Sequence, residues 1–277
     1  MIKNKRILVT GGAGSIGSEL VRQLAPKNKI FILDNNETGT FDLHEELTQD
    51  GHWVAYRVGD VRNKETVQDV FSDFKPQFVF HAAAYKHVTP MEVYPEEAVQ
   101  TNIIGTLNVL KAAKNLECVE KFVYISTDKV IHSNSVMGAT KRVGEIMVKN
   151  SGKGFMAVRF GNVLGSRGSV IPLWQNQINR GKPITVTDER MTRYFMTIPQ
   201  ACELVIRAGE EGKGGEIFIL DMGEQVNVLD LAKKIITGTN VQIKMIGIRP
   251  GETLDEELMT DEEKKRAIKS GNYFIIK

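Results

Sequence analysis

A short apolar run followed by a glycine-rich turn near the N-terminus most constrains how this chain can fold. Ile7–Val9 precedes the stretch Thr10-Gly11-Gly12-Ala13-Gly14-Ser15-Ile16-Gly17, and an amphipathic segment, Ser18–Leu24, follows it. Glycines at this spacing permit a tight turn, a close approach of the backbone to a pyrophosphate, and close packing of a helix on a strand. The first amides of that helix are donors for an anion. We therefore expect a strand–turn–helix unit that binds a dinucleotide through Gly11, Gly14, Ser15, Ile16 and Gly17.

The end of the second apolar run indicates which dinucleotide binds. Ile30–Leu33 is followed by Asp34, at the distance where a carboxylate accepts hydrogen bonds from an adenosine ribose. The residues Asp34-Asn35-Asn36-Glu37 include no Arg or Lys to pair with a 2′-phosphate, and two carboxylates would repel one. The sequence therefore favours NAD over NADP.

Apolar runs and amphipathic segments then continue to alternate. We expect strands at residues 53–58, 78–81 and 122–126, and helices at 64–74 and in a long segment that reaches Asn115. Because the runs are continuously apolar rather than two-faced, they predict an α/β fold with a doubly wound parallel sheet covered by helices on both faces. Asp60 and Val61 follow the third strand, where Asp60 would bond the adenine amino group. A solvated loop aspartate is nearly as good an interpretation of Asp60.

The alternation loosens after residues 159–163, and glycines, prolines and basic residues become frequent from 164 to 199. A returning helix is expected at 201–209, a strand at 217–220, and an amphipathic helix at 228–236 with Asn227 as its cap. We predict a dinucleotide-binding domain of residues 1–163 and 198–236, and a smaller substrate-binding lobe of residues 164–197 and 237–277.

Composition limits the partners. The 277 residues include 36 basic and 34 acidic side chains, for a net charge of +2, which does not favour nucleic acid or an anionic membrane as the main partner. Cys118 and Cys202 have neither metal-site spacing nor the density of a disulfide scaffold. Neither a signal-peptide core nor an apolar run long enough to cross a bilayer is found. We expect a soluble, cytoplasmic protein.

The stretch Ser126-Thr127-Asp128-Lys129 brings a hydroxyl, a carboxylate and an ammonium together at the end of an apolar run, and Lys141 lies on the following helix. Composition alone equally allows a solvated Asp128–Lys129 ion pair. The carboxyl ends of parallel strands, however, form the sheet edge at which ligands bind in open α/β folds. This position favours chemistry over a surface ion pair.

With these motifs in hand, the chain resembles the extended short-chain dehydrogenase/reductase superfamily. Within it, the chain is most similar to the nucleotide-sugar 4,6-dehydratases, in the UDP-N-acetylglucosamine branch. The resemblance covers Ile7 to about Glu263 and rests on five stretches: residues 10–17, 81–88, 126–129, 159–172 and 191–196. It implies a Rossmann-type fold and a cofactor site that also includes Ala82, Ala83 and Lys141.

One departure from the superfamily concerns its catalytic tyrosine, because Met137 stands at that position and cannot exchange a proton. The resemblance implies oxidation at sugar carbon 4, loss of water across carbons 5 and 6, and return of the hydride, with NAD recycled. Asp128 and Lys129 are then the expected acid and base, the former kept protonated by a desolvated pocket and the latter kept neutral by burial near Lys141. Thr127 would bond the carbon-4 oxygen, with Ser126 sharing that polar role.

Further residues are expected at the UDP-sugar. Arg193 and Arg249 are candidates for the diphosphate because guanidinium forks suit phosphate oxygens. The other predicted substrate-binding residues are Lys86, His87, Asn162 and Glu252. A metal site at His81, Lys86 and His87 is not predicted, since no third ligand at suitable spacing accompanies them.

Two features concern the protein beyond its site. Several relatives have a membrane-spanning N-terminal region that this sequence lacks, so we expect a bare catalytic domain. Relatives are commonly dimers or larger, which predicts a homo-oligomer that packs through the helix ending near Asn115 and the helix at 136–150.

Two other functions compete with the dehydratase. A nucleotide-sugar 4-epimerase would act at carbon 4 only, but epimerases of this superfamily rely on the tyrosine that Met137 replaces. A non-catalytic dinucleotide sensor would explain the lost tyrosine. Retention of Asp128, Lys129 and Lys141 together argues against the sensor.

Overall fold

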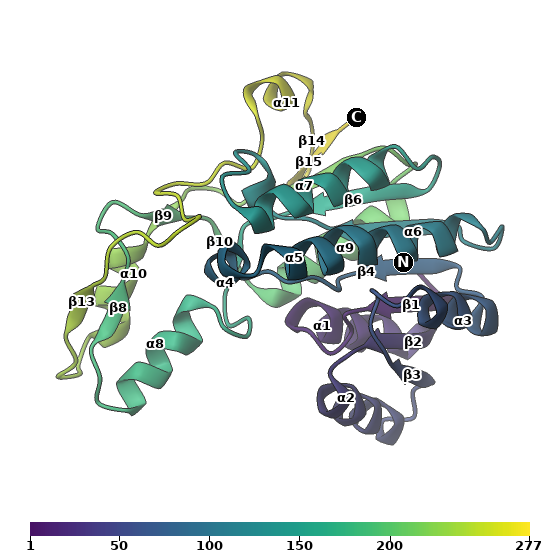
Figure 1. Cartoon of the computed structure of the whole chain (residues 1–277), viewed down its shortest axis with the longest axis horizontal. Helices are drawn as coiled ribbons and strands as arrows, with labels where there is room; N and C mark the ends of the chain where they lie inside the picture. Colours follow the sequence, from purple (N-terminus) through teal and green to yellow (C-terminus); the bar gives the residue numbers. More distant parts are fainter.

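The computed structural model describes all residues, 1–277, and is built around one nine-stranded sheet (Figure 1). Its strands are β1 (Arg6–Thr10), β2 (Lys29–Asp34), β3 (Val54–Val58), β4 (Phe78–His81), β5 (Lys121–Ile125), β6 (Phe155–Arg159), β11 (Ile217–Leu220), β14 (Ile268–Ser270) and β15 (Tyr273–Ile276). They lie in the order β14-β15-β11-β6-β5-β4-β1-β2-β3. All neighbouring pairs from β11 to β3 are parallel. Strand β15 is antiparallel to β11, and β14 is antiparallel to β15. The predicted α/β class and parallel sheet are confirmed.

Helices cover both faces of this sheet, each over its own apolar core. One face carries α1 (Ser15–Leu24), α2 (Glu37–Gln49) and α9 (Ile198–Glu211), and the other carries α3 (Lys64–Phe74), α6 (Thr106–Lys114) and α7 (Val136–Lys149). Continuously apolar strands such as β4 supply side chains to both cores, as expected for a sheet buried on both faces. The strand order reverses between β1 and β4, which places a crevice at the carboxyl ends of these two strands.

A smaller lobe lies beside this edge of the sheet, to the left in Figure 1. It contains α8 (Val170–Asn179), β8 (Ile184–Val186), α10 (Val228–Ile236) and β13 (Ile243–Met245), with β8 and β13 paired in parallel. Two short pairs connect it to the main body: β7 (Asn162–Val163) with β10 (Phe195–Met196), and β9 (Thr192–Arg193) with β12 (Val226–Asn227). Its own core is closed around Trp174, which is fully buried.

Two segments contradict the predicted domain boundaries. Helix α10 has the predicted bounds and the predicted Asn227 cap, but Val228 and Ala232 pack into the core of the small lobe rather than onto the sheet. Conversely, residues 268–276 form β14 and β15 of the main sheet, where Tyr273 and Ile276 are buried in its two cores. The remaining domain boundaries stay a prediction.

The helix expected to reach Asn115 is a series of segments. These are α4 (Val88–Val93), α5 (Pro95–Ala98), a π-helical stretch η2 (Val99–Gly105) and α6. The π turn contains Asn102, whose buried amide bonds both the N–H and the carbonyl of Tyr85 and also the Thr140 hydroxyl. Such turns recur at functional sites. In this chain the π turn joins the loop after β4 to α7.

The remaining short helices are η1 (Ala25–Lys27), η3 (Asp128–Val130) and α11 (Asp261–Arg266). None of the helices has both the length and the apolar character needed to cross a membrane. Four exposed apolar side chains, Val99, Ile104, Val143 and Ile146, lie on η2 and α7, the faces expected to pack in an oligomer. The homo-oligomer stays a prediction.

Candidate active site

Two adjoining cavities open at the carboxyl ends of the strands. The larger, of about 930 Å³, lies between the sheet edge and the small lobe, and the smaller, of about 210 Å³, lies beside β2 and β3. Every predicted site residue lines one or both of them. The larger is lined by Gly11, Gly14, Ser15, Ile16, Gly17, Ala82, Lys86, His87, Thr127, Asp128, Lys129, Lys141, Asn162, Arg193, Arg249 and Glu252. The smaller is lined by Gly11, Gly14, Asp34, Asp60, Val61, Ala82 and Ala83.

The glycine-rich turn has no room for side chains at two positions. A Cβ atom on Gly11, whose φ is +70°, would lie 2.5 Å from the backbone nitrogen of Ala83. A Cβ atom on Gly17 would lie 2.1 Å from the Gly11 carbonyl oxygen. Helix α1 follows with Gly14 as its N-cap and no capping side chain, so its first amides are left for a ligand at the floor of the larger cavity.

Asp34 is fixed at the rim of the smaller cavity. Its two carboxylate oxygens accept hydrogen bonds from the N–H groups of Ala13 and Asn36, each at 2.8 Å. Each oxygen keeps a further lone pair for a ribose hydroxyl. Asp60, in contrast, forms an ion pair with Arg62 at 2.7 Å and also accepts a bond from Asn35. The glycine-rich turn, the free amides at the start of α1 and the oriented carboxylate of Asp34 together fit a dinucleotide.

The central polar cluster follows β5. Asp128 is fully buried, and its Oδ1 accepts hydrogen bonds from the Thr127 hydroxyl at 2.9 Å and from Lys129 Nζ at 3.0 Å. Lys129 Nζ also donates to the side-chain oxygen of Asn162 at 3.2 Å. A solvated loop ion pair is thereby excluded for Asp128, and the cluster faces the larger cavity.

Glu256 is a further member of this cluster, and no sequence pattern indicated it. This carboxylate is 6% exposed, and its Oε1 lies 2.9 Å from Lys129 Nζ and 3.2 Å from Arg193 Nε. It comes from an irregular segment, residues 246–260, and neither periodicity nor a motif distinguishes it from the neighbouring Asp255 and Glu257. Only the fold brings it to the end of β5.

These contacts correct the protonation states that the sequence analysis expected. Burial alone would lower the pKa of Lys129, but Asp128 and Glu256 raise it, so Lys129 is a cation rather than a neutral base. Burial alone would raise the pKa of Asp128, but the Lys129 ammonium and the surrounding hydrogen bonds lower it, which favours the carboxylate. For Glu256, burial and the negative charge of Asp128 prevail over Lys129 and Arg193, and raise the pKa to about 7.

Arg193 was expected to bind the diphosphate, but most of its hydrogen bonds are to backbone carbonyls of the protein. Its guanidinium donates to the carbonyls of Thr192, Thr253 and Leu254 at 2.6–2.9 Å, in addition to its pairing with Glu256. Four of the five N–H groups of an arginine are therefore engaged, and one is left for a ligand. Arg249 is half exposed and forms an ion pair with Glu252 at 2.6 Å at the cavity rim.

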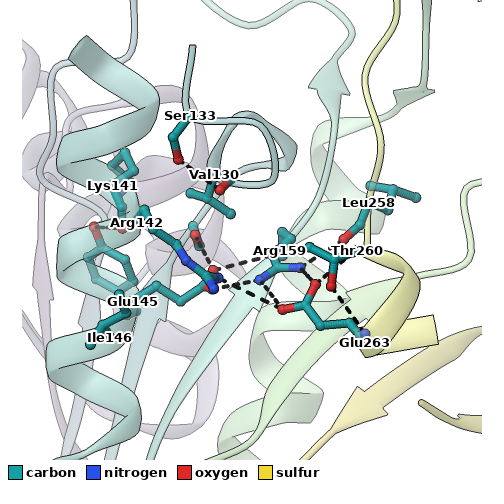
Figure 2. A network of polar contacts seen from close by, with 12 residues as sticks. Val130, Ser133, Lys141, Arg142, Glu145, Ile146, Arg159, Leu258, Thr260 and Glu263 are labelled. Carbon is teal, nitrogen blue, oxygen red and sulfur yellow. Dashed lines mark hydrogen bonds and ion pairs between the residues drawn. The ribbon is translucent and has the colours of Figure 1, made fainter. Parts of the chain in front are cut away.

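A second buried arginine, Arg159, also contacts the segment of residues 246–260. Arg159 is fully buried, and its guanidinium bonds both oxygens of Glu145, both oxygens of Glu263 and the carbonyl of Leu258 (Figure 2). The Ser126 hydroxyl donates to Glu145 at 2.7 Å. Ser126 thus belongs to this network and also lines the larger cavity, so its polar role at the sugar stays a prediction.

Lys141 and Met137 lie side by side on the first turns of α7. Lys141 Nζ donates to the Ile125 carbonyl at 2.5 Å and lies 4.0 Å from the centre of the Tyr124 ring. Burial lowers the pKa of Lys141 to about 7. Met137 is 2% exposed and packs in a small apolar cluster with Met91 and Ala98, while also lining the larger cavity.

The loop after β4 supplies basic groups to the other wall of the cavity. Burial and the nearby Arg167 and Lys129 lower the pKa of Lys86, whose ammonium donates to the Ser166 hydroxyl at 3.3 Å. The His87 ring lies against Gly168, where a Cβ atom would come within 2.6 Å of it. His81 lies apart from them in the core, bonded to the hydroxyls of Thr10 and Thr106 at 2.6 and 2.9 Å.

Arg167 is a further residue that the sequence analysis missed. Its backbone N–H donates to the Ser15 hydroxyl at 3.0 Å, and its guanidinium donates to the Ala13 carbonyl. It lines both cavities and so connects the loop before α8 with the glycine-rich turn. A lone arginine in a glycine-rich loop has no sequence signal that would reveal this contact.

Comparison with known proteins identifies the family. A family model described as "Polysaccharide biosynthesis protein" matches residues 7–277. The chain belongs to the polysaccharide biosynthesis protein family. "Capsular polysaccharide biosynthesis protein CapD" of Staphylococcus aureus is 50% identical over 277 residues, which cover 95% of this chain and 46% of that protein. This family member thus spans about half the length of the curated relatives that it matches first.

Relatives and solved structures with different activities share the fold of this family member. "UDP-glucose 4-epimerase" of Rickettsia bellii is 37% identical over 290 residues, 100% of this chain and 84% of that one. The X-ray structure of Pen from Bacillus thuringiensis has a TM-score of 0.93 at 40% identity, and covers 99% of this chain and 88% of that one. UDP-glucose 4-epimerase of Thermus thermophilus in complex with NAD has a TM-score of 0.80 at 27% identity, over 92% and 90% of the two chains. DesIV, a dTDP-glucose 4,6-dehydratase of Streptomyces venezuelae, shares the fold at 22% identity, with a TM-score of 0.80 over 94% and 90%.

Proposed function

We propose that this family member is a nucleotide-sugar 4,6-dehydratase. It converts UDP-N-acetylglucosamine, or a close UDP-hexose, to a 4-keto-6-deoxy sugar for the synthesis of surface polysaccharide or glycan. The observation that carries the proposal is the buried acid–base cluster of Asp128 and Lys129 beside Met137. With no phenol available at position 137, proton transfer falls to the carboxyl and ammonium groups that line the same cavity.

NAD is the proposed cofactor, held by the glycine-rich turn, by Asp34 and by Lys141. When bound, it takes up a hydride from the sugar and later returns it. The carboxylate of Asp34 suits the two free hydroxyls of an adenosine ribose and would repel a 2′-phosphate. Arg167 is the one basic residue that lines the smaller cavity, and its guanidinium donates to the Ala13 carbonyl.

The roles within the cluster follow from charge. A cationic Lys129 stabilises negative charge that develops on a carbonyl oxygen and cannot accept a proton, whereas the Asp128 carboxylate can accept one. The Thr127 hydroxyl donates its proton to Asp128, so we propose that its oxygen accepts a hydrogen bond from the carbon-4 hydroxyl of the sugar. Lys86, His87, Asn162, Arg249 and Glu252 line the remaining wall and are proposed to contact the sugar and its diphosphate.

A UDP-sugar 4-epimerase is the second candidate. It is favoured by the identity with proteins named UDP-glucose 4-epimerase, which extends over the whole of this chain. Epimerisation needs proton transfer at carbon 4 only, and the superfamily uses a tyrosine for it. Met137 and the additional buried acid–base groups speak for a reaction with more proton transfers.

The test is incubation of the purified protein with UDP-N-acetylglucosamine, followed by mass spectrometry. A dehydratase yields a product lighter by one water molecule, an epimerase leaves the mass unchanged while altering the sugar, and a non-catalytic sensor leaves the substrate as it was. Asp128→Asn and Lys129→Ala should each lower turnover by roughly 10²-fold or more, with NAD binding intact. Met137→Ala is the matched change on the same cavity wall and should lower turnover much less.

A further inference from the structure

The two buried carboxyl groups of the cluster come from distant parts of the chain and meet at one ammonium. Asp128 and Glu256 each direct one oxygen to Lys129 Nζ, at 3.0 and 2.9 Å. Because both contact the same nitrogen atom, the two carboxyls lie close to each other. Both residues line the larger cavity, so the pair is placed where a ligand would bind.

Each of the two carboxyls, Asp128 and Glu256, has one oxygen that accepts no hydrogen bond. Asp128 Oδ2 and Glu256 Oε2 are both buried, and no protein N–H or O–H group donates to either. Two facing carboxylates offer only acceptors to each other, and burying an unsatisfied charged acceptor is costly. One proton between the two carboxyls removes the deficit, because it converts one of them into a donor for the other.

We propose that Asp128 and Glu256 share a single proton, and that Glu256 is thereby a third acid–base residue of this site. The proton sharing does not depend on the proposed dehydratase function, whereas the catalytic part rests on it. Two carboxyl groups that lie close together do not both ionise freely, and other such pairs hold one proton between them.

The shared proton matches the elimination step. Asp128 as carboxylate takes the proton from sugar carbon 5, and the electrons of that C–H bond form the double bond between carbons 5 and 6. The C6–O bond breaks, and the departing oxygen takes the proton from Glu256 and leaves as water. The pair begins and ends this step with one proton, and only its position within the pair changes.

The groups that face Glu256 explain why it, rather than Asp128, holds the proton. Asp128 receives bonds from both Lys129 and Thr127, which stabilise its charged form. Glu256 is faced by Lys129 and Asp128 from η3 and by Arg193 from β9. Burial and the Asp128 charge outweigh these cations and raise the pKa of Glu256 to about 7.

Glu256 is also held rigidly. The Gln225 amide donates to its backbone carbonyl at 2.6 Å, Arg193 bonds the carbonyls of Thr253 and Leu254, and Arg159 bonds the carbonyl of Leu258. Preorganisation of this kind is expected for a group that transfers a proton, since small misplacements reduce rates strongly.

Proton sharing can be tested without catalysis. Protein labelled with ¹³C at the glutamate side-chain carboxyl is titrated in an infrared cell, with unlabelled protein as the reference. We expect a protonated-carboxyl band that shifts with the label and disappears at a midpoint near pH 7. Glu256→Gln should abolish this band, and Glu262→Gln, an exposed position on α11, should leave it. A glutamate titration confined to the ordinary range near pH 4 would overturn the proposal.

The catalytic part is tested by turnover of UDP-N-acetylglucosamine. Glu256→Gln should lower kcat by roughly 10²-fold with little change in KM and unchanged NAD binding, and Glu262→Gln should act like the wild type. Wild-type turnover by Glu256→Gln would overturn the acid–base role. If the wild type itself released no dehydrated product, the dehydratase proposal would fail, while the infrared titration would still decide the proton sharing. That titration uses the wild type, so it also decides the case in which the variant does not fold.

Discussion

Arg159→Met should destabilise the protein strongly although it removes no group that lines the cavity. Arg159 is fully buried, and all five of its N–H groups are engaged with Glu145, Glu263 and the Leu258 carbonyl (Figure 2). Methionine approximates the volume of the side chain but donates no hydrogen bond. The variant therefore buries two carboxylates that have lost their main cation.

The magnitude follows from what remains beside these carboxylates. Removing one partner of a buried ion pair costs about 3–5 kcal/mol, because the other partner stays buried and uncompensated. Arg142 still lies 2.8 Å from Glu145 and 3.8 Å from Glu263, so the two losses do not simply add. We expect a loss of about 3–5 kcal/mol in the free energy of unfolding, which at a slope of roughly 2–3 kcal/mol/M lowers the urea midpoint by about 1–2 M.

Urea unfolding followed by circular dichroism measures this loss. Arg142→Met is the matched control at the exposed end of the same network and should cost at most about 1 kcal/mol. Adding Glu145→Gln and Glu263→Gln to Arg159→Met should restore part of the stability, since the uncompensated charges are then removed. A single variant with the wild-type midpoint, or a triple variant no more stable than the single one, would refute the argument.

The same experiment has a pH dependence with a definite sign. Burial would raise the pKa of Glu263, but the hydrogen bonds from Arg159 outweigh burial and lower it. A carboxyl with a lowered folded-state pKa contributes stability above its unfolded pKa of about 4.3, and this contribution is lost as the pH falls through the folded value. The difference in the free energy of unfolding between the wild type and Arg159→Met should therefore become smaller as the pH falls below about 4.

Three further predictions concern the cavities. Asp34→Ala should weaken NAD binding by about 1–2 kcal/mol, and tighter binding of NADP than of NAD by the wild type in a fluorescence titration would contradict the assignment of NAD. Arg249→Ala should raise KM for a UDP-sugar more than it lowers kcat, whereas Arg193→Ala, which releases the segment of Glu256, should lower both kcat and the urea midpoint. Lys141 binds fewer protons in the folded than in the unfolded state between about pH 7 and 10, so stability should rise with pH across this window, and Lys141→Met should lack that rise in urea unfolding.

The sequence was sufficient for the elements that local pattern and caps determine. Helix α3 has the predicted bounds, with Asn63 accepting a bond at its start, and β4, β11 and α10 also lie as predicted. Strands β14 and β15 were missed because they are short and enter the sheet only through the pairing of β15 with β11, which joins residues far apart in the chain. Nonlocal pairing of this kind has no local signal.

The same distinction explains which site residues were predicted. Those that follow a strand, such as Asp34 after β2 and Asp128 after β5, lie at the sheet edge because all parallel strands end there. Glu256 follows no strand. Its position depends on contacts of Arg193 and Arg159 with its segment, across 61 and 99 positions of the chain.

The pKa values of two lysines near this cavity shift in opposite directions, as do those of two carboxyls, and this divergence supports the roles proposed for them. Lys129 lies between two carboxyls and keeps its proton, while Lys141 faces a carbonyl and an aromatic ring, and its pKa falls to about 7. The pKa of Asp128 is lowered, chiefly by the Lys129 ammonium, while burial and the Asp128 charge raise the pKa of Glu256 to about 7. Groups of one type that are driven apart by their environments mark the acid and the base of a site. Under the proposed function, a chain with methionine at position 137 would therefore use a fixed cation, a base and an acid at the end of β5 in place of a phenol.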